Sequence, residues 1–196
     1  MIRFCIRESP DTLNSWDRHG RTPLIVAIEH RQADAVKLLP DHGADVDGGH
    51  RPFFRTALMQ AAKNGCMPSV TLLLDQGADV GHEDIVGRTA LTMAAENGHD
   101  EVLDLLLAEY AGEAPENSGP LTQLFLCAAW YGQTGTVEHL VRRGFDIQSK
   151  DASGRTALAV VAEEGNPKAV GELLHAGADI DAEDPRGDTA LLTAAR

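Results

Sequence analysis

The chain lacks several features that mark specialised classes of protein. It has 3 cysteines, Cys5, Cys66 and Cys127, and no C-x-x-C pair, which argues against a disulfide framework or a zinc ribbon. No apolar run approaches the roughly 18 residues that a membrane span needs, and no apolar stretch at the N-terminus precedes a small-residue cleavage site. We therefore expect an intracellular protein in a reducing compartment, cytoplasmic with the nucleus as an alternative.

Positive charge is also scarce. The sequence has 17 basic and 30 acidic residues, a formal net charge of -13. Residues 97–196 account for most of the excess, with 7 basic and 17 acidic residues. This sign is wrong for neutralising the phosphates of nucleic acid or an anionic membrane surface. We expect neither nucleic acid nor a membrane as a partner.

Catalytic motifs are missing as well. The sequence contains no phosphate-binding G-x-x-x-x-G-K-[ST], no G-x-S-x-G and no kinase signature, and H-E-x-x-H fails because Val86 stands where His82-Glu83 would need a second histidine. The acidic run from Asp179 to Asp184 alternates as a calcium loop does, but the repeat described next also explains its spacing. We expect no enzyme activity, catalytic residue, cofactor, metal or small-molecule substrate.

A phrase of the form T-x-L recurs at nearly constant spacing. It begins at Thr22, Thr56, Thr89, Thr156 and Thr189, with Gln123-Leu124-Phe125 in the gap between the third and fourth. Successive spacings are 34, 33, 34, 33 and 33 residues. D-x-x-G precedes four of the phrases, and Gly-Ala-Asp follows three of them by 21 residues. This register indicates a tandem repeat.

Each repeat predicts a tight turn followed by two short antiparallel helices. The glycine of D-x-x-G can adopt a positive φ in the turn, and the threonine hydroxyl can cap the first helix. A second glycine, such as Gly65 or Gly165, ends that helix. The second helix carries apolar residues on one face, as in Val70, Leu73 and Leu74. Because one unit cannot bury this face alone, we expect the units to stack into a continuous core.

The repeat resembles that of the ankyrin family, D-x-x-G-x-T-P-L-x-x-A-A-x-x-G followed by V-x-x-L-L-x-x-G-A-D. The resemblance implies an all-α fold, an ankyrin-repeat solenoid of helix-turn-helix units joined by hairpin-like turns. We expect a single ankyrin-repeat domain over residues 1–196. Its parts are a half-unit at 1–16, units at about 17–50, 51–83, 84–117, 118–150 and 151–183, and a half-unit at 184–196.

The unit at 118–150 diverges from the pattern, because it lacks both D-x-x-G and T-x-L. Before it lies the polar stretch Gly112–Pro120, which we predict to be the loosest junction of the array. The half-units at both ends leave two interpretations open. The chain is either a complete array or a segment of a longer protein.

The resemblance also implies where partners dock, on the concave side formed by the turn tips and the ends of the first helices. Turn tips carry apolar residues at 53, 85 and 86, and an aromatic pair at 130–131 stands where neighbouring units have polar residues. Exposed aromatic residues are typical interface anchors. The predicted partner-binding residues are Phe53, Ile85, Val86, Glu96, Asn97, Trp130, Tyr131, Glu163 and Glu164. An alternative interpretation folds Trp130 inward to fill the core of its divergent unit.

These observations favour a non-enzymatic protein-protein interaction module, or scaffold, that binds a protein or peptide in its concave groove. The glutamates that flank the aromatic pair predict a partner with a basic segment. The alternative is a regulatory or substrate-docking ankyrin segment of a larger enzyme or signalling protein, whose catalytic domain lies outside these residues.

Overall fold

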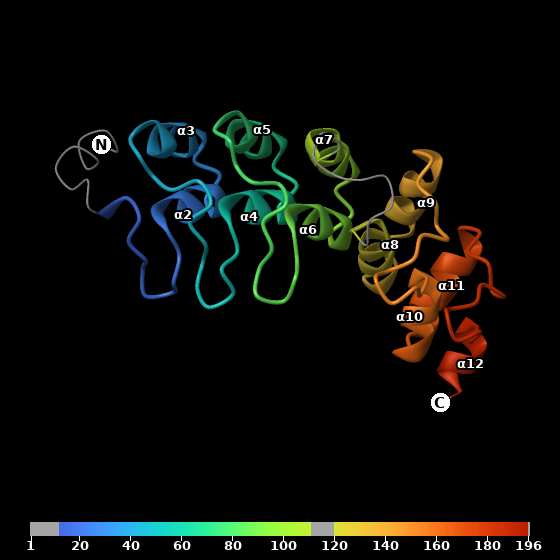
Figure 1. The fold of residues 1–196 in the computed structure, drawn as a ribbon. Helices are drawn as coiled ribbons and strands as arrows, with labels where there is room; N and C mark the ends of the chain where they lie inside the picture. Colours follow the sequence, from blue (N-terminus) through green and yellow to red (C-terminus); the bar gives the residue numbers. More distant parts are fainter. Residues whose placement is uncertain (1–11, 111–119, 196) are drawn as a thin grey trace. The chain divides into compact units, whose positions relative to one another are not determined.

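The computed structural model describes residues 12–110 and 120–195, and every regular element in these ranges is a helix (Figure 1). The helices are α2 (Pro23–Glu29), α3 (Ala33–Asp41), α4 (Ala57–Lys63), α5 (Met67–Asp75), α6 (Ala90–Glu96), α7 (Asp100–Tyr110), α8 (Pro120–Trp130), α9 (Thr134–Arg142), α10 (Ala157–Glu163), α11 (Pro167–His175) and α12 (Ala190–Ala194). Isolated bridges between His50 and Arg55, and between Lys150 and Thr156, are the β-type pairings in the same ranges. The predicted all-helical fold is confirmed.

The chain divides into two compact units. The first is Met1–Ala94 with Glu101–Tyr110, and the second is Ala95–Asp100 with Ala111–Arg196. In the first unit, α2 packs beside α4 and α3 beside α5, so the helices form two layers (Figure 1). The second unit repeats this arrangement, with α8, α10 and α12 in one layer and α9 and α11 in the other (Figure 1).

The repeated threonines cap the first helices as predicted. The hydroxyl oxygens of Thr56 and Thr156 each accept a hydrogen bond of 3.3 Å from the backbone N–H three residues further on. Such a cap is worth about 1 kcal/mol because it satisfies a backbone donor that the helix leaves without a partner. At the other end, Gly65 and Gly165 follow the helix with φ of 64° and 67°, the left-handed region that favours glycine.

The turns before these helices are organised by an aspartate as well as by a glycine. One carboxylate oxygen of Asp17 accepts hydrogen bonds from the backbone N–H groups of His19 (2.8 Å) and Arg21 (2.9 Å). The aspartates of the other D-x-x-G phrases, Asp84, Asp151 and Asp184, make the same pair of bonds. Sequence analysis attributed the turn to glycine alone, whereas the aspartate fixes its backbone.

The core lies between the two helix layers of each unit. Small residues such as Ala61 and Ala62 are fully buried and let the first helices approach closely. In the second helix α5, Val70 and Leu73 are fully buried, whereas Leu74 is only half-buried. The first leucine of the Val-x-x-Leu-Leu pattern is therefore the one that fills the core.

Some predictions fall outside the described residues. These are the part of the N-terminal half-unit up to residue 11, which includes Cys5, and residues 112–119 of the predicted loose junction. Cys127 is buried and Cys66 half-buried, and no disulfide links these two cysteines.

Candidate functional site

The aromatic pair of the second unit stands at the end of α8. Trp130 is the last residue of the helix, and the backbone N–H of Tyr131 donates to the Cys127 carbonyl at 3.1 Å. The exposed fractions are 40% for Trp130 and 52% for Tyr131. The alternative in which Trp130 folds inward to fill the core is therefore wrong.

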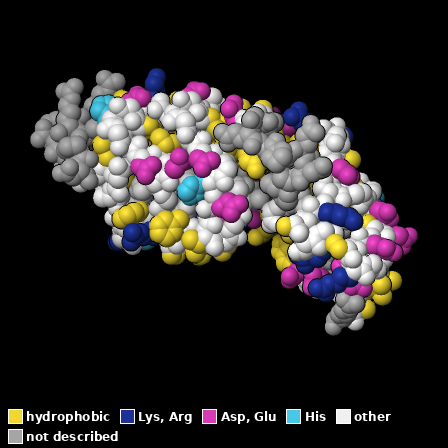
Figure 2. Space-filling model, in the orientation of Figure 1, with side chains coloured by type: hydrophobic (Ala, Val, Ile, Leu, Met, Phe, Trp, Pro, Cys, Tyr) yellow, Lys and Arg dark blue, Asp and Glu magenta, His cyan; other side chains and the backbone are white. Residues whose placement is uncertain are grey.

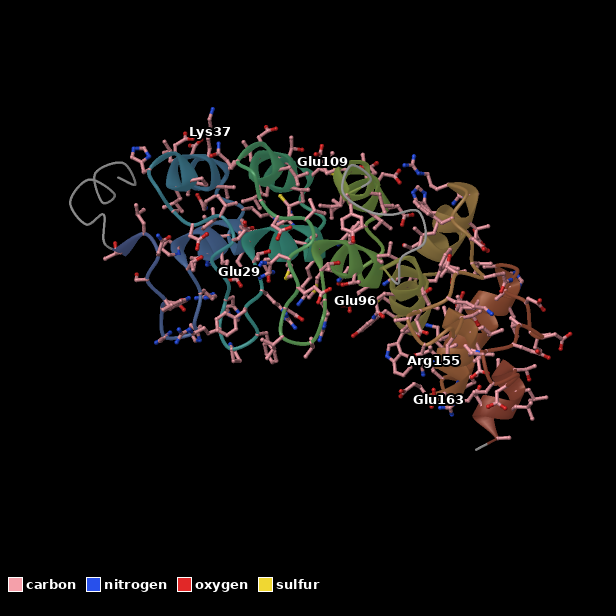
Figure 3. The ribbon with its side chains drawn as sticks, viewed as in Figure 1. Glu29, Lys37, Glu96, Glu109, Arg155 and Glu163 are labelled. Carbon is pink, nitrogen blue, oxygen red and sulfur yellow. The ribbon has the colours of Figure 1, made fainter. Side chains whose placement is uncertain are left out.

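Helix α10, which ends at Glu163, packs against α8, which ends at Trp130. Glu163 and Glu164 are both exposed. A carboxylate oxygen of Glu163 lies 2.9 Å from Nη1 of Arg155 (Figure 3). Nη2 of the same arginine lies 3.0 Å from a carboxylate oxygen of Asp151. The charge of Glu163 is thus already partly balanced within the chain. Glu164, the C-cap residue that follows α10, therefore presents the more available negative charge.

The third predicted position of the second unit is the end of α6. Glu96 and Asn97 are half-buried. The Glu96 carbonyl accepts a hydrogen bond of 3.1 Å from the side-chain amide of Gln133, which places the start of α9 against this helix end. The repeat spacing of 34 and 33 residues shows that equivalent positions on successive first helices are occupied by Glu96, Trp130 and Glu163.

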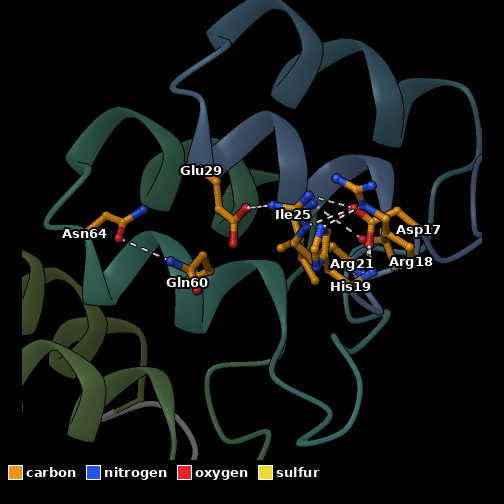
Figure 4. A network of polar contacts seen from close by, with 9 residues as sticks. Asp17, Arg18, His19, Arg21, Ile25, Glu29, Gln60 and Asn64 are labelled. Carbon is orange, nitrogen blue, oxygen red and sulfur yellow. Dashed lines mark hydrogen bonds and ion pairs between the residues drawn. The ribbon is translucent and has the colours of Figure 1, made fainter.

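The arginine network of α10 has a counterpart in the first unit. Arg21 lies 2.7 Å from a carboxylate oxygen of Asp17 and 2.6 Å from one of Glu29, so the guanidinium joins the turn to the end of α2 (Figure 4). The same residue types recur in the sequence as Asp17/Arg21/Glu29, Asp84/Arg88/Glu96 and Asp151/Arg155/Glu163. Sequence analysis missed this pattern, although its spacing follows the repeat.

These networks change the acidity of the turn aspartates. Hydrogen bonds from the Arg21 side chain and backbone hold the pKa of Asp17 well below its usual range, because they stabilise the ionised carboxylate. For Asp151, partial burial raises the pKa, but hydrogen bonds from the backbone and side chain of Arg155 and from Ser153 together bring it below the usual value. Both aspartates therefore stay ionised in mildly acidic solution.

The predicted residues of the first unit lie at two neighbouring turn tips. The Phe53 carbonyl accepts a hydrogen bond of 3.1 Å from the backbone N–H of Ile85, which holds the two tips together. Phe53, Ile85 and Val86 are all exposed, with 62% of Ile85 accessible to solvent. The Arg55 guanidinium lies over the Phe53 ring at 5.0 Å, within the range of a cation-π interaction.

Three further residues at this edge of the first unit were not predicted from the sequence. The Arg51 guanidinium stacks on the Trp16 ring at 3.9 Å from its centroid and lies 5.9 Å from that of Phe54. The indole N–H of Trp16 donates to the Gly49 carbonyl at 3.3 Å. Trp16 and Phe54 are both exposed. The run of two phenylalanines between arginines at 51–55 is the signal that could have found Arg51 and Phe54.

Within 12–110 and 120–195, no cluster of three or more His, Cys, Asp or Glu side chains could hold a metal ion. In the same part of the chain, no helix has the length and apolar character needed to cross a bilayer.

Comparison with known proteins identifies the family. The model for ankyrin repeats in three copies matches residues 46–118 and 124–196, and the single ankyrin-repeat model matches residues 19–49. Together these matches cover most of the sequence. The chain belongs to the ankyrin-repeat family.

Individual relatives agree with this assignment. The chain is 36% identical over 165 residues to the B-cell lymphoma 3 protein homolog of Mus musculus, a match that covers 82% of this chain and 36% of that protein. It is 31% identical over 184 residues to a transient receptor potential cation channel subfamily A member 1 homolog of Caenorhabditis elegans, covering 77% of this chain and 15% of the channel. The chain thus spans about a third or less of the length of these relatives.

Solved structures show the same fold. The ankyrin repeat domain of Bcl-3, described as a unique member of the IkappaB protein family, superposes with a TM-score of 0.73 at 23% sequence identity. That match covers 98% of this chain and 86% of the Bcl-3 chain. The human ASB11 ankyrin repeat domain gives a TM-score of 0.71 at 22% identity, covering 98% and 85% of the two chains. At this identity the likeness establishes the fold alone.

Proposed function

We propose that this chain is a non-enzymatic protein-protein interaction module, and that it binds a protein or peptide through the turn tips and first-helix ends. The observation that carries the proposal is the exposed pair Trp130-Tyr131 at the end of α8. Large aromatic side chains expose apolar surface to water, which is unfavourable, and burying them at an interface provides much of the binding energy of many complexes. An intracellular location, cytoplasmic or nuclear, fits a chain in which no disulfide links the two described cysteines.

In the second unit, we infer that the partner offers a basic segment. The exposed Glu164 and the acidic composition of residues 97–196 set the sign of the charge that a partner meets there. Glu163 contributes less, because Arg155 already lies 2.9 Å from its carboxylate. Charge of this kind steers and speeds the encounter, while the aromatic pair supplies most of the affinity.

Affinity capture followed by measured binding tests the proposal. The purified chain and a Trp130→Ala/Tyr131→Ala variant are used as bait in cell extract, and proteins lost with the variant are purified for binding measurements. Leu191→Ala/Leu192→Ala is the matched control, because it removes two exposed apolar side chains elsewhere in the second unit. Thermal unfolding of each variant shows whether it is folded.

We expect the aromatic variant to dissociate faster and to lose roughly 2 kcal/mol or more of binding free energy, as hot-spot residues do. Salt near 0.5 M should slow association, because the Debye length falls well below its value of about 10 Å at 0.1 M. If the affinity for the partner changes neither in the aromatic variant nor with salt, this surface is not the binding site. A variant that unfolds more easily but binds normally would assign Trp130 to stability.

The second candidate function is a regulatory or substrate-docking segment of a larger enzyme or signalling protein. The observation that favours it is coverage, because the matched region amounts to 36% of one relative and 15% of another. An antibody raised against this chain would detect a band well above 21.0 kDa in cell extract if the chain is part of a longer polypeptide. A band at that mass would argue for the module alone.

A further inference from the structure

The exposed aromatic and apolar residues of the first unit form one continuous surface, which we call the tip ridge. It consists of Trp16, Arg51, Phe53, Phe54, Ile85 and Val86. The arginine connects its aromatic members, since the Arg51 guanidinium lies 3.9 Å from the Trp16 centroid and 5.9 Å from that of Phe54. The ridge therefore crosses three successive turns that are far apart in the sequence.

Backbone contacts hold the three turns in register. The backbone N–H of Arg51 donates to the Gly20 carbonyl at 2.9 Å, and that of Ile85 donates to the Phe53 carbonyl at 3.1 Å. The first two turns approach so closely that a Cβ atom on Gly20 would lie 2.7 Å from the Arg51 carbonyl oxygen. A surface fixed in this way loses little conformational entropy on binding, which favours affinity.

The ridge is also the basic edge of an acidic chain. The turns at 16–21, 50–55 and 84–88 contain five arginines, Arg18, Arg21, Arg51, Arg55 and Arg88, against two aspartates. Two of these arginines are themselves paired, Arg21 with Asp17 and Glu29, and Arg55 with the Asp84 side chain, which is 0% exposed. The positive charge of the ridge itself is that of Arg51, which is stacked on Trp16. On the visible face, hydrophobic side chains adjoin Lys or Arg side chains along this edge of the first unit (Figure 2).

We propose that the tip ridge binds an acidic polypeptide segment that carries apolar side chains. This inference rests on the proposed function and names the partner chemistry of the first unit, which is opposite in charge to that of the second. Carboxylates of the segment would pair with the outward N–H groups of the stacked arginines, since a guanidinium on an aromatic face keeps its donors free at its edge. Its apolar side chains would cover Phe54, Ile85 and Val86.

An acidic peptide fits better than single-stranded nucleic acid, which also binds arginine and aromatic residues. Bases need an open ring face to stack on, whereas Arg51 occupies a face of Trp16. The net charge of -13 opposes a phosphate backbone that carries a charge at every nucleotide. A short acidic segment can instead place its few charges against the arginines alone.

Selection from a random peptide library displayed on phage tests the proposal with the full chain as bait. Enriched peptides are made synthetically, and their affinities are measured by fluorescence anisotropy for the wild type, Arg51→Glu and Phe54→Ala. Arg142→Glu is the control for charge, because it makes the same reversal at an exposed arginine of α9 in the other unit. Circular dichroism establishes that each variant is folded.

We expect the peptides sensitive to Arg51→Glu to be rich in Asp, Glu and large apolar residues, and to bind that variant at least about tenfold more weakly. Phe54→Ala should weaken the same peptides through lost apolar contact, and Arg142→Glu should leave them unchanged. Replacing their acidic residues with amides should abolish the difference between Arg51→Glu and the wild type.

Several outcomes would overturn the inference. If enriched peptides lose affinity when Trp130 is replaced but bind Arg51→Glu as tightly as the wild type, the tip ridge is not a docking site while the proposed function stands. If no peptide is enriched over a blank surface, the proposed function fails as well. Tighter binding of an oligothymidine probe that Arg51→Glu abolishes would assign the ridge to nucleic acid. Dimerisation in sedimentation experiments that is lost in the same variant would assign it to a second copy of the chain.

Discussion

Truncation of Leu73 in α5 measures how strongly the stacked helices hold one another. The Leu73 side chain is 0% exposed, and α5 packs against both α3 and α4. Leu73→Ala removes about three carbon atoms, worth roughly 2 kcal/mol of transfer free energy at about 0.8 kcal/mol per methylene. The cavity left in a packed interior raises the expected loss of unfolding free energy to about 2–5 kcal/mol.

Leu74→Ala is the matched control, because it makes the same chemical change one residue further along the same helix. Leu74 is only half-buried, so its truncation opens less cavity and should cost clearly less than that of Leu73. Helix propensity does not separate the two variants, because each replaces leucine with alanine inside α5. Any difference between them therefore reports packing.

Urea unfolding followed by far-ultraviolet circular dichroism gives the two free energies. The slope against urea must be compared first, since repeat arrays can unfold in parts and a changed slope would reveal this. A loss within about 0.5 kcal/mol for Leu73→Ala, the behaviour of an exposed site, would refute the assignment of this helix face to the core. A larger loss for Leu74→Ala than for Leu73→Ala would refute it too.

Two further predictions concern the turns. Gly20→Ala should destabilise the fold by about 1–3 kcal/mol more than Gly187→Ala, because both glycines have a positive φ but only at Gly20 does the added Cβ meet the Arg51 carbonyl, at 2.7 Å. Thermal unfolding compares the two, and equal losses would mean that the contact between turns relaxes freely. Asp151→Asn should lower the free energy of unfolding at neutral pH and approach the wild type as the pH falls below about 4, because the pKa of Asp151 in the fold lies below the unfolded value of about 3.9. Urea titrations across this pH range test it, and a pH-independent difference would exclude the carboxylate as the source.

The candidate site could be predicted only in part. The positions of Trp130, Tyr131, Ile85 and Val86 at turn tips and helix ends follow from the repeat, and all four are exposed. Their role in binding stays a prediction. The contact between Trp16 and Arg51 was not predicted. Trp16 precedes the first complete repeat, so the repeat alignment does not indicate which residues lie beside it.

The period, the helices and the caps follow from local sequence, because threonine, glycine and leucine act on their own turn or helix within a few residues. The contacts that form between stacked repeats depend instead on the tertiary structure. Three features depend on how one repeat stacks on the next. They are the contact of Arg51 with Trp16, the bond from Arg55 to the buried Asp84, and the burial of Leu73 in preference to Leu74. The first two contacts join residues about 30 positions apart. A periodic pattern predicts that equivalent positions of neighbouring repeats align, but it does not predict the contacts of residues that occur in one repeat only.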